Sequence, residues 1–409
     1  MPGGGTSAEP PAGREPAGES KELRVSQTRV ARSAGDAVSD PAAFDLMLAR
    51  VAERREEFCR LRHVPRDMVE EFKNVGIFRA ATPREFGGDA LPPADFLRMI
   101  ERISEVDASA GWVASFGSAT TYLAALPRDS FAELFADGPD LVFAGGLFPV
   151  QPAEPVPGGY RVSGRWKFAS GCQGADVLGV GIGVGDASSG KPRTALLRPH
   201  QVEIVEQWDV VGLQGTGSHD LKVDGAVVPE EHTFVRGGRP SVDEPLYHYP
   251  TMAYAAQVLA VVNLGVARAA LDHVVRAGGA RSITGSPSLA ERPYYRITAA
   301  KAEAALRSVR AFFYDTTEEV YASVAAGDPA TPDQGSLLRL AAAHVAHVGF
   351  EVVRTAYNLS GTSAIHSAHP MQRYLRDASV VPQHAFLNEG MYDNAGSVLL
   401  GRAAAPGYL

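Results

Sequence analysis

The chain of 409 residues contains only two cysteines, Cys59 and Cys172, which lie far apart in the sequence. Two distant thiols without a CxxC motif supply neither a disulfide framework nor the ligands of a structural zinc site. The chain also lacks an uncharged apolar run of roughly 18 residues, and its N-terminus lacks the apolar core of a signal peptide. We therefore expect a cytoplasmic protein with no metal site, no membrane span and no export signal.

Positively charged residues are outnumbered. The sequence has 39 Lys and Arg against 47 Asp and Glu, which gives a formal net charge of −8. Binding to nucleic acid calls for a basic face, so we expect a small-molecule partner and no nucleic acid. With 45% hydrophobic and 21% charged residues, the chain has the composition of a globular protein. Its length suffices for two or three domains.

Composition divides the chain into five segments. The first 20 residues contain nine Pro or Gly and, beyond Met1, no large hydrophobic residue, so they cannot form a packed core. From Pro41 onward apolar residues recur at helical spacing. Short β-like runs follow, and four long Ala-rich segments complete the chain. We predict a disordered tail (1–40), an N-terminal helical domain (41–140), a small antiparallel β-barrel (141–245), a C-terminal four-helix bundle (246–400) and a short tail (401–409).

One stretch in the predicted barrel, GRWKFASG at residues 164–171, combines two large aromatic residues with a small hydroxyl and glycines. Trp166 and Phe168 are two residues apart, so on a regular strand their side chains share a face. Both rings could simply belong to the core. Ser170 and Gly171 at the strand end favour a site for a flat ligand, because these small residues allow it to approach the backbone closely.

Three further motifs follow in the predicted bundle. Arg281 stands in ARSITGSPSL, Gly361 in the glycine turn of NLSGTSAIHSAHPMQRYLRDA, and His384 in a QH pair. Taken singly, Arg281 could be a helix-end cation and His384 a core histidine. In their order and spacing, together with GRWKFASG, the motifs resemble the acyl-CoA dehydrogenase fold over residues 41–400. Within that fold the chain is similar to the two-component flavin-dependent monooxygenases, which hydroxylate aromatic or polyketide substrates.

The resemblance implies the oxygenase component of such a system, supplied with reduced flavin by a separate NAD(P)H:flavin reductase. Reduced FMN, with FAD as the other possibility, would react with O2 to a C4a-hydroperoxide that transfers oxygen to an aromatic or polyketide-like small molecule. The resemblance also implies a homotetramer assembled through the bundle. The first bundle helix is apolar on nearly every side from Ala253 to Ala270, which agrees with burial at a subunit contact.

The resemblance further assigns roles to individual residues. Those expected to bind the cofactor are Trp166, Phe168 and Gly171 against the flavin ring, Ser170 at its N5, Arg281 at the phosphates of a neighbouring subunit's cofactor, and Gly361. Ser170 and His384 would take part in catalysis, with His384 on the reactive side of the ring. The substrate pocket would include Trp112, Thr120 and Gly146. Some phenol hydroxylases of this group carry a histidine where Thr120 stands, and a threonine cannot act as a base near pH 7. The substrate would therefore be an intrinsically activated ring, or an amine that is N-oxygenated.

Two other functions stay open at this point. An acyl-CoA dehydrogenase needs a glutamate base within reach of the substrate proton. Ungapped comparison places Ala385 and Ala255 at the two positions where the family carries this base, and a slip of four residues would bring in Glu389. The third possibility is a scaffold or interaction protein that kept the fold and lost the flavin.

Overall fold

The computed structural model describes residues 3, 40–184, 192–278 and 288–408. Arg281 and nearly all of the predicted N-terminal tail lie outside these residues. The described chain begins with helices, and Asp40 caps the first of them by accepting the backbone N–H groups of Ala42 and Ala43. The helices of this first part are α1 (Pro41–Leu61), α2 (Arg66–Asn74), α3 (Pro93–Val106), α4 (Ala108–Ala114), α5 (Thr120–Leu123) and α6 (Arg128–Glu133).

Eight strands follow and form two four-stranded sheets, with strand orders β1-β4-β5-β8 and β2-β3-β7-β6. In the described residues, β1 and β4 pair in parallel and every other strand pair is antiparallel. The predicted small antiparallel β domain is confirmed, with that one parallel pair as a difference. The strands are β1 (Phe143–Pro152), β2 (Glu154–Val156), β3 (Gly159–Ala169), β4 (Val177–Gly183), β5 (Arg193–Leu197), β6 (Glu203–Val205), β7 (His219–Pro229) and β8 (Thr233–Val235).

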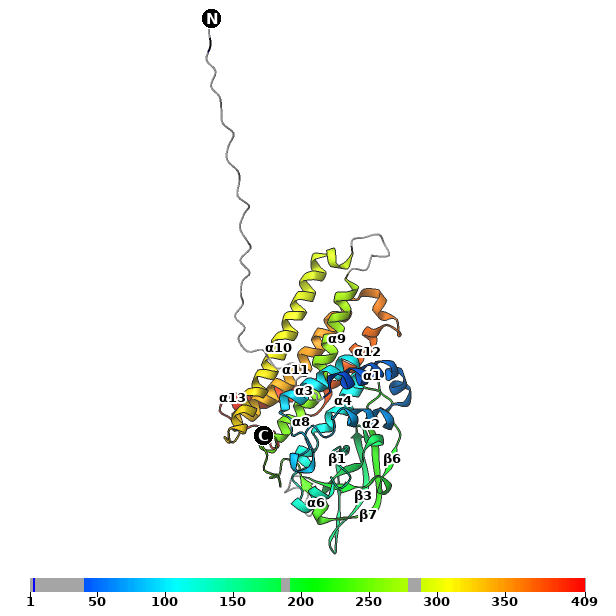
Figure 1. The fold of residues 1–409 in the computed structure, drawn as a ribbon, viewed down its shortest axis with the longest axis vertical. Helices are drawn as coiled ribbons and strands as arrows, with labels where there is room; N and C mark the ends of the chain where they lie inside the picture. The colour runs from blue at the N-terminus through cyan, green and yellow to red at the C-terminus, as the bar shows by residue number, and fades with distance from the viewer. Residues whose placement is uncertain (1–2, 4–39, 185–191, 279–287, 409) are drawn as a thin grey trace. The chain divides into compact units, whose positions relative to one another are not determined.

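The remaining chain is helical again, and α9, α10 and α11 run side by side in Figure 1. Asn263 on α9 donates to the carbonyl oxygens of Ala346 on α11 and Ala378 on α12, which ties three helices together. Gly265 lets α9 approach α3, because a Cβ there would lie 2.4 Å from the carbonyl oxygen of Glu101. The helices are α7 (Pro245–His248), α8 (Thr251–Ala260), α9 (Val262–Ala277), α10 (Pro293–Ala325), α11 (Pro332–Leu359), α12 (Pro370–Val380) and α13 (Gly390–Leu399).

The apolar helix that the sequence assigned to a subunit contact is buried within a single chain. Ala260, Ala267 and Ala270 are 0% exposed, because α8 and α9 pack between α3 and α11. That interpretation of the helix is wrong, and the homotetramer stays a prediction. The segments Thr251–Ala277 and Pro332–Leu359 are long and apolar enough to cross a membrane, yet 72% and 61% of their most apolar windows are buried inside the protein.

Candidate active site

The two aromatic residues of GRWKFASG, near the end of strand β3, differ in burial. Trp166 is fully buried, and its Nε1 donates to the carbonyl oxygen of Gly181 on β4 at 2.7 Å. Phe168 is 66% exposed. The prediction that both rings share a face is wrong, because the pairing of β3 with β7 shifts register between Trp166 and Ala169 and Phe168 has a φ of 63°. Such a bulge breaks the alternation of a regular strand. Trp166 therefore fills the core, and of the two rings Phe168 alone is exposed to a ligand.

Ser170 joins a chain of buried hydroxyl groups. Its Oγ accepts a hydrogen bond from Trp112 Nε1 at 3.2 Å and lies 2.6 Å from Ser218 Oγ, which lies 2.7 Å from Thr216 Oγ1. Thr216 donates its proton to the carbonyl oxygen of Leu213, so Ser218 must donate to Thr216, and Ser170 to Ser218. A hydroxyl oxygen has two lone pairs. Ser170 thus retains one lone pair for a ligand that donates a hydrogen bond.

His384 completes the cluster from a third part of the chain. Its ring meets Trp112 edge-to-face at 5.8 Å between ring centroids and Phe386 at 5.1 Å. Its Nδ1 accepts the backbone N–H of Phe386 at 3.2 Å, so the neutral ring carries its proton on Nε2. Burial, with smaller effects of Arg236 and Arg339, lowers the pKa of His384 to about 4. The structure therefore brings together Trp112, Ser170 and His384, with His384 uncharged at pH 7.

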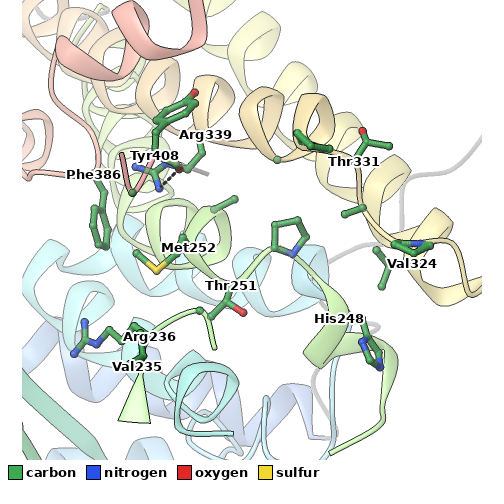
Figure 2. A pocket seen from close by; sticks show the side chains of 18 of the residues that line it. Val235, Arg236, His248, Thr251, Met252, Val324, Thr331, Arg339, Phe386 and Tyr408 are labelled. Carbon is green, nitrogen blue, oxygen red and sulfur yellow. Dashed lines mark hydrogen bonds between the residues drawn. The ribbon is translucent and has the colours of Figure 1, made fainter. Parts of the chain in front are cut away.

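A cavity of about 1410 Å³ lies next to this cluster, and Phe386 belongs to both. Its walls come from β1, the segment after β8, α8, the turn between α10 and α11, and the C-terminal residues up to Tyr408. Figure 2 shows Arg236 and Arg339 at the same end of the cavity as Phe386, whereas His248 and Val324 lie at the other end.

Both cavity arginines were missed by sequence reasoning. The guanidinium carbon of Arg236 lies 4.8 Å from the ring centre of Tyr122, and that of Arg339 lies 5.4 Å from Phe386 and 5.0 Å from Tyr408. The signal was present as single arginines in apolar surroundings, in TFVRGG and SLLRLAAAH. Arg339 is buried and the Nε of Arg236 is buried, and charged groups are almost never fully buried without a reason.

The other predicted site residues do not join the cluster. Thr120 is 1% exposed at the start of α5 and does not line the cavity. At Gly146 on β1 a Cβ would lie 2.7 Å from the carbonyl oxygen of Lys167, so the packing of β1 on β3 accounts for this glycine. Gly361 follows α11 with a φ of 62°, a conformation that favours glycine. Arg281 lies outside the described residues. The predicted ligand contacts of these four residues stay predictions.

The residues at the end of β3 fit a flat, hydrogen-bonding cofactor. Phe168 offers an exposed ring, and Trp208 meets it edge-to-face at 6.2 Å. Ser170, two residues away, has one lone pair without a donor among the described residues. Gly171 follows with a φ of 75°, and a Cβ there would lie 3.6 Å from Val113 on the helix that carries Trp112. An aromatic face beside a hydrogen-bond acceptor matches an isoalloxazine ring.

Known proteins share this architecture. Residues 42–128 match the model of the acyl-CoA dehydrogenase N-terminal domain, and residues 257–389 match that of the acyl-CoA dehydrogenase C-terminal domain. An indole-3-acetate monooxygenase of Pseudomonas putida is 51% identical over 377 residues, which span 91% of this chain and 97% of that protein. The chain belongs to the flavin-dependent monooxygenases of the acyl-CoA dehydrogenase fold. A second indole-3-acetate monooxygenase, from Acinetobacter baumannii, is 43% identical and spans 90% of this chain and 95% of its own.

A relative named as an oxygenase component and two solved structures extend this comparison. The oxygenase component of an FADH2-dependent resorcinol hydroxylase from Rhizobium is 29% identical over 86% of this chain and 90% of its own. The crystal structure of the HsaA monooxygenase from M. tuberculosis has a TM-score of 0.84 and 26% identity, and covers 92% of this chain and all of its own. XiaF from Streptomyces, solved with FADH2, has a TM-score of 0.80 at 20% identity, covering 90% and 99%. The predicted fold and the flavin-dependent oxygenase function are confirmed.

A dehydrogenase role for this monooxygenase is not supported. The Glu389 side chain is 84% exposed and pairs with His347 at 3.7 Å. It is therefore placed in solvent at the start of α13 and not in a dry pocket, where a base that abstracts a carbon-bound proton would act.

Proposed function

We propose that this monooxygenase hydroxylates an indole-type bicyclic ring, with reduced flavin delivered by a separate NAD(P)H:flavin reductase. Bound reduced flavin supplies the chemistry that activates O2 and provides the transferred oxygen atom. The observation that carries the proposal is the meeting of Ser170, Trp112 and His384 at 3.2 and 5.8 Å, beside an exposed Phe168 and a large cavity. The two relatives named indole-3-acetate monooxygenase support the choice of ring.

The proton order in the hydroxyl chain suits a reduced flavin. The N5 atom of a reduced flavin carries a hydrogen, and Ser170 faces its ligand with a lone pair because its own proton is directed to Ser218. Trp112 Nε1 fixes the Ser170 oxygen from the other side. In this proposal Ser170 recognises the reduced state of the cofactor by accepting that N–H.

His384 acts in this proposal as a neutral hydrogen-bond donor. Its Nδ1 is occupied by the Phe386 N–H, and its pKa of about 4 keeps the ring uncharged at pH 7. The Nε2–H can orient a substrate or hold a proton near the reacting atoms. The aromatic contacts of His384 with Trp112 and Phe386 exclude water from this side.

Reduced FMN remains the predicted cofactor, although neighbours in the fold bind either flavin: XiaF was solved with FADH2, and TdsC from Paenibacillus with FMN and indole. An oligomer formed through the bundle remains predicted as well. The exposure of Tyr294 and Ile297 on α10, at 72% and 55%, supports it, because large apolar side chains on a bundle surface favour association. A cytoplasmic location and the lack of a membrane partner complete the proposal.

The test is a single-turnover reaction of the purified protein with chemically reduced FMN or FAD, indole-3-acetate and 18O2. The expected result is a product heavier by one 18O atom with one of the two flavins, and mass spectrometric fragments place that atom on carbon or nitrogen. Consumption of O2 without labelled product would contradict the indole substrate. Bleaching of an oxidised flavin by an acyl-CoA without O2 would contradict the oxygenase mechanism itself.

A further inference from the structure

The cavity contains an arginine without a counter-charge. The Arg236 side chain has no hydrogen bond or ion pair with any residue in the described part of the chain, and its Nε is buried without a partner. Its closest ring contact is the face of Tyr122 at 4.8 Å. Burial lowers the pKa of Arg236, and only Tyr122 opposes this shift. A guanidinium stays charged in proteins, so it calls for an anion, which none of the described residues provides.

The surroundings of Arg236 add positive charge. Arg339 lies at the same end of the cavity in Figure 2, with Nη1 bonded to the carbonyl oxygen of Tyr408 at 3.1 Å and no carboxylate within 4 Å among the described residues. Two acidic residues line the cavity, Asp243 and Asp328. Asp243 pairs with His248 at 2.7 Å, at the opposite end, and Asp328 makes no ion pair with either arginine in the part of the chain described.

A series of side-chain contacts connects the positive end of the cavity to the cluster around Ser170. The guanidinium of Arg339 lies over Phe386, Phe386 meets His384, and His384 meets Trp112, which donates to Ser170. Both arginines also act on His384 electrostatically. Trp112, Ser170 and His384 do not line the cavity, and Phe386 is the wall residue that contacts this cluster, so a molecule with its anionic group at Arg236 would approach the reacting region at Phe386. The apolar side chain of Met252 lies at this end of the cavity in Figure 2 and suits an aromatic body beside the arginines.

We propose that Arg236 binds the carboxylate of an aromatic acid substrate and so selects arylacetate-type acids over neutral rings. This inference rests on the proposed function and names its substrate class. A guanidinium can hold a carboxylate through two parallel N–H bonds, and it gains most where water is excluded. Arg339 is a positioning residue in this proposal, because its Nη1 is anchored to the C-terminal segment while its charge adds to the positive end.

The experiment measures binding of indole-3-acetate, indole-3-acetamide and indole by calorimetry, without flavin, to wild type and to Arg236→Gln, Arg236→Lys and Arg239→Gln. Arg239 is the matched control: it lies three residues away on the same loop, is exposed and does not line the cavity. In Arg236→Gln the affinity for indole-3-acetate should fall about 10- to 100-fold, as for the loss of a charged hydrogen bond. Affinity for the two neutral ligands should stay within about twofold, Arg236→Lys should be intermediate, and Arg239→Gln should equal wild type.

Two outcomes would overturn the assignment. In the first, Arg236→Gln retains wild-type preference for the acid over the amide. In the second, it loses all three ligands equally, which marks a structural role. If Arg236→Gln does not fold, Arg236→Lys decides by the same ratio of acid to amide affinity.

A flavin phosphate is the other anion that could occupy this end. Titration of FMN into the same variants distinguishes the two sources: unchanged FMN affinity in Arg236→Gln supports the substrate carboxylate, and a loss confined to FMN refutes it. Failure of the proposed function would look different, as wild-type protein that binds the acid but forms no oxygenated product with reduced flavin.

Discussion

The end of β3 was identified as a functional candidate from the sequence, whereas the positive end of the cavity, around Arg236 and Arg339, was identified only from the fold. At the end of β3 the important residues are contiguous, so the sequence named Phe168, Ser170 and Gly171, but it could not tell which way the rings face. The positive end of the cavity is assembled from the loop after β8, α11 and the segment after α12. No short motif joins these parts, and only the fold shows that two arginines share one space. A sequence motif can thus identify residues, but the packing of elements that are distant in the sequence determines which surroundings their side chains have.

The sharpest division within the β3 region is between Trp166 and Phe168. Trp166→Ala should destabilise the protein by about 3–5 kcal/mol, the usual cost of removing a fully buried large aromatic side chain. The variant also leaves the carbonyl oxygen of Gly181 without its donor. Urea unfolding followed by circular dichroism measures this loss. Trp166→Phe, which keeps part of the volume, serves as the control and should lose less. A stability equal to wild type in Trp166→Ala would mean that this indole is not in the core.

The sequence could predict the order of helical, β and helical parts, because hydrophobic periodicity and Ala-rich composition are local properties. Its motifs also singled out Ser170 and His384, which the structure brings together through Trp112, while their contacts with a ligand stay predictions. It could not predict the bulge at Phe168, since alternation of side chains assumes an unbroken strand register. Nor could it predict that Ala253 to Ala270 is buried by α3 and α11, because an apolar helix looks the same at a subunit contact and inside a chain.

Ser170→Ala tests whether the hydroxyl chain serves the reaction. The substitution removes the acceptor of Trp112 Nε1, and an unsatisfied buried donor costs about 1–3 kcal/mol. The fraction of consumed O2 released as hydrogen peroxide should rise relative to wild type, which a peroxide assay beside product quantification measures. Ser218→Ala is the matched variant, since it leaves Ser170 in place and frees its proton to turn. Equal coupling of oxygen use to hydroxylation in wild type and Ser170→Ala would remove Ser170 from the site.

Phe168→Ala should weaken flavin binding while leaving stability nearly unchanged, in contrast to Trp166→Ala, which should lower stability. Because the ring is 66% exposed, the free energy of unfolding should change by no more than about 0.5 kcal/mol. Affinity for flavin should weaken by about 0.5–1.5 kcal/mol if the ring packs on the isoalloxazine. Quenching of flavin fluorescence on titration with protein gives this affinity. Phe148→Ala, an equally exposed phenylalanine on β1, is the control and should bind flavin as wild type does.

The smallest expected effect is the contribution of His384 to the pH dependence of stability. The His384 ring lies between the end of β3 and the positive end of the cavity. Its folded pKa of about 4 lies below the value near 6.5 of an unfolded histidine. Between these values the unfolded chain binds more protons than the folded one, so His384 stabilises the fold above pH 6.5 and this contribution is lost as the pH falls toward 4.

From pH 7 to 6, the melting temperature of His384→Asn should fall less than that of wild type, by roughly 1–2 °C. Differential scanning calorimetry measures both proteins, with His200→Asn as an exposed control. Identical falls in wild type and His384→Asn would mean that the folded and unfolded chains protonate His384 alike, so the folded pKa would not be lowered and the dry surroundings proposed for the Nε2–H donor would be contradicted.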